Sequence, residues 1–157
     1  ILNDRPLIGT YGVNHEGSSD MYYKGANILH MLRMIAQDDE LWRSTLRGLN
    51  KDFYHQTVSS KMVEDYIASK LGIDLGPFFT QYLRTTMIPT LECRLSKDGL
   101  AYRFNNVIPN FYMPLDLSID HKNHRIVPTT QWQQLSLDQK PDNVSLAEDY
   151  YITLVKE

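Results

Sequence analysis

The apolar residues of this chain change their spacing at Pro89, and this change constrains the fold more than any other feature of the sequence. Before Pro89 they recur every three or four positions, which is typical of amphipathic helices. After Pro89 they alternate with polar residues, as Leu91 and Cys93 do, which is typical of strands with one buried face. The pattern predicts an α+β protein, with a helical bundle over residues 1–88 followed by a small antiparallel β-sandwich over residues 89–157.

Four helices are expected in the first part of the chain, and each has a residue suited to its start. The side-chain oxygen of an N-cap residue accepts a hydrogen bond from a backbone N–H of the first turn. Gly72 is expected to end the third helix, because glycine adopts the left-handed C-cap conformation at little cost. The predicted helix starts are Asp20, Asp38 or Asp39, Ser59 and Asp74.

About five short strands are expected in the second part. The segment 96–99 reads Ser-Lys-Asp-Gly and is expected to turn the chain between the first two strands, which would then form a hairpin. Three further strands are expected within residues 113–119, 126–133 and 150–155, separated by polar turns around Asn123 and around residues 141–143.

The most specific motif of the chain is Tyr22-x-Lys24-Gly25, within a segment of helical periodicity. A phenol has a pKa of about 10, so it stays protonated at neutral pH and can donate a hydrogen bond to a developing oxyanion. Tyr22 and Tyr23 are neighbours on the expected helix and point about 100° apart, so only one of them can face a given site.

The other residues of this helix have interpretations of their own. Lys24 and His30 belong to a narrow polar stripe, and His30 is interpreted as structural rather than catalytic. Gly25 lies inside the helix, where glycine costs about 1 kcal/mol relative to alanine. We therefore expect another element to approach the helix closely at Gly25.

The segment around Tyr22 resembles the catalytic-tyrosine helix of the zinc aminopeptidases related to aminopeptidase N, which are gluzincin metallopeptidases. The resemblance continues through residues 57–59 and 78–83 to Pro89, and covers roughly residues 8 to 92, with Tyr82 where a tryptophan is more usual. It implies a peptide substrate, a zinc cofactor and a fold in which a helical part precedes a β-sandwich. It also implies that Tyr22 is the catalytic residue that stabilises the oxyanion.

The zinc motif of that family, His-Glu-x-x-His, does not occur in this sequence. It holds zinc because two histidines four positions apart share one face of a helix. The nearest string, residues 15–19, reads His-Glu-Gly-Ser-Ser and ends in a serine where the second histidine would be. His121 and His124 are three positions apart in a polar segment, which we interpret as a solvated turn rather than a metal site.

The sequence has no initiator methionine and begins at Ile1. We therefore expect it to be a fragment from the carboxyl side of a longer peptidase, whose upstream catalytic domain would be its partner and would supply the zinc ligands and the general-base glutamate. By itself, the fragment is expected to bind no zinc and to be inactive. The alternative is a catalytically dead module of the same fold that binds peptides or acts as a scaffold, in which Tyr22 is only a packed helix residue.

Charge and composition narrow the remaining functions. The net charge is −3, and the lysines and arginines are scattered, which argues against a nucleic-acid partner because phosphate binding needs a basic patch. No apolar run approaches eighteen residues, so no membrane segment is expected. Cys93 is the single cysteine and lies in an alternating strand, which predicts a buried, inert thiol. Localisation stays open.

Overall fold

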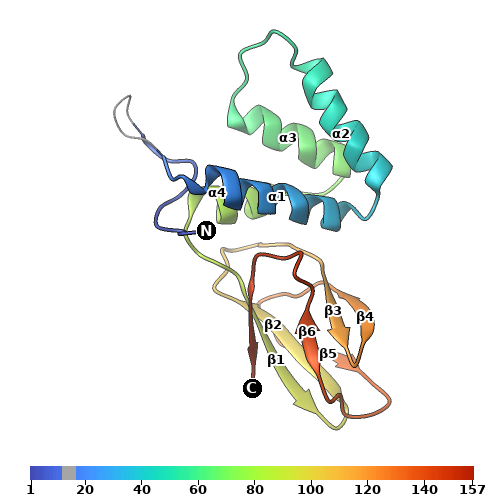
Figure 1. The fold of residues 1–157 in the computed structure, drawn as a ribbon. Coiled ribbons are helices and arrows are strands. Elements are labelled where there is room, and N and C mark those ends of the chain that lie inside the picture. The colour runs from blue at the N-terminus through green and yellow to red at the C-terminus, as the bar shows by residue number, and fades with distance from the viewer. Residues whose placement is uncertain (12–16) are drawn as a thin grey trace.

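The computed structural model describes residues 1–11 and 17–157 of the chain, in which helices are followed by strands (Figure 1). This arrangement confirms the predicted α+β class. The helices are α1 (Asp20–Ala36), α2 (Asp39–Asp52), α3 (Ser60–Leu71) and α4 (Gly76–Arg84). The strands are β1 (Thr90–Ser96), β2 (Gly99–Asn105), β3 (Leu115–Ile119), β4 (Lys122–Ile126), β5 (Gln133–Ser136), β6 (Val144–Leu146) and β7 (Thr153–Lys156).

Two of the predicted helix starts and the predicted helix end are confirmed. The carboxylate of Asp38 accepts a hydrogen bond from the backbone N–H of Leu41 at 2.9 Å, which caps α2. Ser59 caps α3 in the same way, with its hydroxyl accepting from the backbone N–H of Met62 at 3.3 Å. Gly72 ends α3 in the left-handed conformation, with a φ of 66°.

The other two helix starts were wrong. Asp20 lies inside the first turn of α1, after Ser19 at the N-cap, and its carboxylate accepts backbone N–H groups of the N-terminal segment instead. Asp74 precedes α4 by two residues, because its carboxylate accepts from the backbone N–H of Gly76 at 3.0 Å and forms a turn ahead of the helix.

The strands form two sheets, in the orders β5-β2-β1-β7 and β4-β3-β6. The predicted hairpin is confirmed, since β1 and β2 pair in antiparallel register up to Ser96 and Gly99. One strand pairing departs from the antiparallel arrangement expected for this part of the chain. Strand β7 returns to the edge of the first sheet parallel to β1, with Thr153 beside Thr90.

One predicted strand and one predicted turn were also wrong. The turn lies at Asp120 and His121, both with positive φ, and not around Asn123, which pairs with Ser118 within β4. Two consecutive residues with positive φ are what a tight two-residue hairpin needs, and they fix the β3–β4 register. Residues 126–133 are not one strand, because β4 ends at Ile126 and β5 begins only at Gln133.

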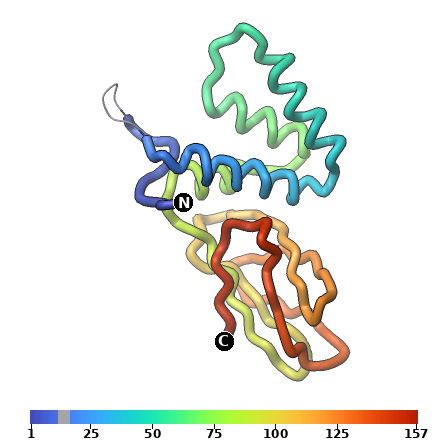
Figure 2. The backbone as a smooth tube through the Cα atoms, in the orientation of Figure 1, coloured from blue at the N-terminus to red at the C-terminus, as the bar shows by residue number. Residues whose placement is uncertain are grey.

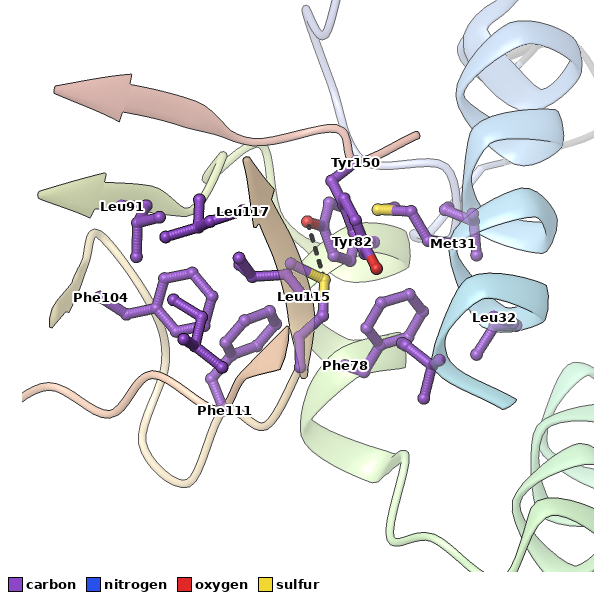
Figure 3. Close-up of a cluster of buried hydrophobic side chains, with 14 of the residues drawn as sticks. Met31, Leu32, Phe78, Tyr82, Leu91, Phe104, Phe111, Leu115, Leu117 and Tyr150 are labelled. Atoms are coloured by element: carbon purple, nitrogen blue, oxygen red, sulfur yellow. Dashed lines mark hydrogen bonds between the residues drawn. The ribbon is translucent and has the colours of Figure 1, made fainter. Parts of the chain in front are cut away.

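Helices and strands bury their apolar side chains in one continuous cluster (Figure 3). Met31 of α1 and Phe78 of α4 lie at the helical side of this cluster, and Phe104 and Leu117 lie at the strand side. Tyr82 of α4 lies between them. The last helix ends at residue 84, yet the apolar cluster contains side chains from both sides of this change in secondary structure. The proposed division into domains 1–88 and 89–157 stays a prediction.

The N-terminus lies beside the connection between α4 and β1 (Figure 2). The side-chain amide of Asn3 donates to the backbone carbonyl of Thr86 at 2.6 Å, and the backbone N–H of Ile8 donates to the carbonyl of Leu83 at 2.8 Å. Of the helices in residues 1–11 and 17–157, none is both long and apolar enough to cross a bilayer.

Candidate functional site

Tyr22 lies two residues after Asp20, in the first turn of α1, and faces solvent. Its backbone N–H donates to the carbonyl of Ser19 at 3.4 Å, which holds the residue within the helical start. Its side chain is 70% exposed, and that of Tyr23 is exposed to the same extent. Exposure therefore does not distinguish the two phenols. What can distinguish them is the surface beside each one.

A groove of about 520 Å³ runs between α1, α3 and α4, and Tyr22 lines it whereas Tyr23 does not. Most of its lining is apolar, so it can accept apolar side chains of a ligand. The main contributors are Met21, Gly25 and Leu29 from α1, Val63 and Ile67 from α3, and Phe79 and Leu83 from α4. Because residues 22, 25 and 29 share one face of α1, the groove follows the side of the helix on which Tyr22 lies.

The expectation that another element approaches α1 at Gly25 was wrong. A Cβ atom built on Gly25 would meet no other heavy atom within 4 Å. Gly25 faces the groove, so its missing side chain widens an open surface instead of admitting a neighbouring element. The low helix propensity of glycine is accepted at this position without any gain in packing within the described chain.

Glu64 is the charged residue of the groove, and it is already paired. Both of its carboxylate oxygens accept from the guanidinium of Arg84, at 2.7 and 3.1 Å. The residue is only 8% exposed. A buried carboxylate held in a two-point ion pair is committed to structure, which makes Glu64 a poor candidate for proton transfer in the groove.

Lys24 is the part of the motif whose burial the sequence interpretation did not predict. It lies on the narrow polar stripe of α1, but it is completely buried. Its ammonium donates to the side-chain oxygen of Asn3 at 2.8 Å and to the backbone carbonyl of Thr85 at 3.3 Å. Burial lowers the pKa of Lys24 from its ordinary value, and the nearby Asp20 opposes that shift. No pattern within α1 could have revealed these partners, which come from residues 21 and 61 positions away.

His30 lies on α1 away from the groove lining and contacts the strand half of the molecule. Its Nε2 lies 2.6 Å from a carboxylate oxygen of Asp149, in the segment that leads to β7. Both side chains are partly exposed. This contact joins helix to loop, in keeping with the structural interpretation of His30.

The residues that the structure describes do not fit a zinc site. Among them, no three His, Cys, Asp or Glu side chains come together as metal ligands would. His121 lies at the exposed β3–β4 turn and His124 within β4. His15 and Glu16 of the near-match to the zinc motif lie outside the described residues. Cys93 is buried, and burial raises its pKa to about 11, so its thiol is protonated at neutral pH.

Comparison with known proteins gives a fold relationship. No family model matches the chain, and no curated protein matches it. Among solved structures, it resembles Legionella pneumophila aminopeptidase A, determined in complex with aspartic acid, with a TM-score of 0.70 and 16% identity. The match covers 89% of this chain and 18% of that aminopeptidase. At this identity the likeness shows that the chain shares the fold of a part of a peptidase.

Proposed function

We propose that this chain is part of a zinc-dependent aminopeptidase of the gluzincin type, and that it contributes the oxyanion-stabilising Tyr22 but not the zinc ligands. The observation that carries the proposal is the position of Tyr22. Its phenol opens onto an apolar groove, on a fold shared with part of an aminopeptidase. The zinc, which would activate the water that attacks the peptide, would be held by residues outside those described here.

In this proposal the chain has one chemical task. When a scissile carbonyl is attacked, negative charge develops on its oxygen, and a donor placed where that charge forms stabilises the transition state more than the ground state. The Tyr22 phenol is protonated at neutral pH and can be such a donor. Tyr22 is 70% exposed, so a bound substrate or the rest of the longer protein would have to cover it before exclusion of water strengthened a hydrogen bond to an anion.

A second function is favoured by a different observation. The groove is lined mainly by apolar side chains, and its one carboxylate, Glu64, is occupied by Arg84. A surface of this kind can bind a peptide without transforming it. In this alternative the longer protein has kept the fold, lost the metal, and become a peptide-binding or scaffolding module.

The two functions are separated by measurements on the longer protein to which the chain would belong. A zinc aminopeptidase should contain one zinc per chain and hydrolyse aminoacyl anilides. It should lose that activity to a chelator and regain it with added zinc. A scaffolding module should bind peptides without any of these properties. A purified protein that holds no zinc and cleaves no anilide would contradict the enzymatic proposal.

A further inference from the structure

We propose that Lys24 is a positioning residue for Tyr22, because its buried ammonium fixes the start of α1 against the N-terminal segment and the α4–β1 connection. The inference rests on the proposed function of Tyr22. In this inference, Lys24 supports the position of Tyr22 and does not contact substrate.

Lys24 cannot reach a ligand in the groove. Its side chain has no exposed surface, and it does not line the groove. Positions 22 and 24 are separated by about 200° around a helix, so the two side chains leave α1 on opposite sides. Lys24 therefore acts on Tyr22 only through the backbone that they share.

Burying the ammonium of Lys24 costs free energy, which suggests that this lysine has a specific role. A buried ammonium loses its hydration, and the two acceptors that replace it, Asn3 and Thr85, are both neutral. None of the ion pairs in the described residues includes Lys24. An apolar side chain of similar size would fill the space but would leave the acceptors on Asn3 and Thr85 without this donor. What the ammonium provides, and an apolar group cannot, is a directional connection between three segments.

Asn3 is the centre of that connection. Its side-chain oxygen accepts from Lys24, its side-chain amide donates to the carbonyl of Thr86 at 2.6 Å, and its backbone N–H donates to the carboxylate of Asp20. The other oxygen of that carboxylate accepts the backbone N–H of Leu2 at 3.0 Å. The start of α1 is thus held from two positions four residues apart, Asp20 and Lys24, which lie on either side of Tyr22 in the sequence.

Tyr22 needs such support because its own side chain has little. In the described part of the chain, no hydrogen bond involves its hydroxyl, and the ring is mostly exposed. The helix start sets the position and the Cα–Cβ direction from which the phenol extends. A small rotation of that turn would move the hydroxyl by an ångström or more, and a misplacement of about 1 Å can cost about 10²-fold in rate.

The first test is structural and uses this chain. Lys24→Met and, as a second variant that spares the core, Asn3→Ala each remove two side-chain hydrogen bonds. Each should raise the amide hydrogen-exchange rates of residues 2–3 and 20–23 by about 10-fold or more. The amides of β1 and β2 should be unaffected. Lys61→Met is the matched control, because Lys61 is an exposed lysine on α3 that, among residues 1–11 and 17–157, pairs with Asp65 alone. Unchanged exchange at the start of α1 in Asn3→Ala would overturn the inference.

The second test measures coupling in the longer, active protein. If Lys24 acts through Tyr22, Lys24→Met should lower kcat by about 10-fold or more with little change in KM, and should cost nothing further when Tyr22→Phe is already present. A merely structural lysine would lower activity by the same factor in both backgrounds, and that result would overturn the inference alone. If Tyr22→Phe by itself left kcat unchanged, the proposed function would fail first and the positioning role would fail with it.

Discussion

The hydroxyl of Tyr82 donates a hydrogen bond to the backbone carbonyl of Tyr151 at 3.0 Å, and this bond connects the last helix to the segment that leads into the final strand. Tyr82 lies in the middle of the shared apolar cluster (Figure 3) and has no exposed surface. Burial raises its pKa well above the ordinary value, so the phenol stays a donor under all mild conditions. This hydrogen bond therefore helps to fix the position of the segment before β7 relative to α4.

Tyr82→Phe should therefore destabilise the chain although it removes only one atom. The carbonyl of Tyr151, which is partly buried, would lose this donor, at a cost of about 1 to 3 kcal/mol. Urea denaturation should show this decrease in the free energy of unfolding. Tyr54→Phe is the control, since Tyr54 is largely exposed and the same change there should cost almost nothing.

The ion pair between Glu64 and Arg84 should contribute measurably to stability. Arg84→Met would leave a nearly buried carboxylate without its partner, and because Arg84 is itself about one-third exposed, we expect a loss of about 1 to 3 kcal/mol. Lys61→Met breaks an exposed pair on the same helix and should cost less than about 0.5 kcal/mol. Equal effects of the two substitutions in thermal or urea unfolding would contradict this assignment.

The features that the sequence predicted correctly are local. Asp38 and Ser59 cap helices through backbone groups three residues away, and Gly72 needs only its own backbone freedom. The Ser96 to Gly99 hairpin is likewise decided within a few residues. Such interactions depend on short spacing, so a pattern of residue types is enough to predict them.

The features that were missed depend on distant partners. The sequence places Lys24 on a narrow polar stripe, and its partners Asn3 and Thr85 are brought to it only by the fold. Asp20 is a residue type favoured at the N-cap, but its carboxylate accepts hydrogen bonds from residues 17 and 18 positions earlier instead. The parallel return of β7 also follows from tertiary packing and leaves no signal in the alternation of the strand. In the candidate site, the sequence indicated Tyr22, and the groove beside it came only from the arrangement of three helices.

Cys93 should make the stability of the chain fall as the pH rises above about 9. Burial raises its pKa from 9.0 to about 11, so the folded state keeps a proton that the unfolded state releases in this interval. This stabilising contribution is complete below pH 9 and is lost as the pH rises towards 11, by about 2 to 3 kcal/mol. Tyr82 and Tyr150, whose pKa values are also raised by burial, add to the decrease at higher pH.

The comparison with Cys93→Ala isolates this effect. The variant shifts stability by a constant amount at all pH values through the lost packing, but it has no thiol to titrate. The difference between the original chain and the variant should therefore shrink or reverse between pH 9 and pH 11, as measured by urea unfolding at each pH. A difference that stays constant across this interval would show that the buried thiol is not linked to stability.

The chain on its own should neither bind stoichiometric zinc nor hydrolyse aminoacyl anilides. The described residues bring no set of three metal-ligating side chains together, and residues 15–19 lack the second histidine of the zinc motif. Elemental analysis of the folded, dialysed chain and an anilide assay with added zinc test both statements. One tightly bound zinc per chain would contradict the expectation and would require a ligand set that the present arrangement does not provide.

The assignment of Tyr22 leads to a prediction with a control on the same helix turn. In the longer zinc aminopeptidase that we propose, Tyr22→Phe would remove one hydrogen-bond donor while the ring keeps its place on the groove, so packing would be nearly conserved. Loss of one such donor lowers kcat by about 10² to 10³, and KM should change far less because the hydrogen bond strengthens in the transition state.

Tyr23→Phe is the control, because Tyr23 is as exposed as Tyr22 but is turned about 100° from it and does not line the groove. It removes the same hydroxyl group from the same helix turn, so any effect on helix stability or solubility should be equal for both variants. Steady-state kinetics on an aminoacyl anilide should therefore separate them by about two orders of magnitude in kcat. If both variants lost activity equally, or if Tyr22→Phe raised only KM, Tyr22 would bind substrate or support the fold and would not be the oxyanion donor.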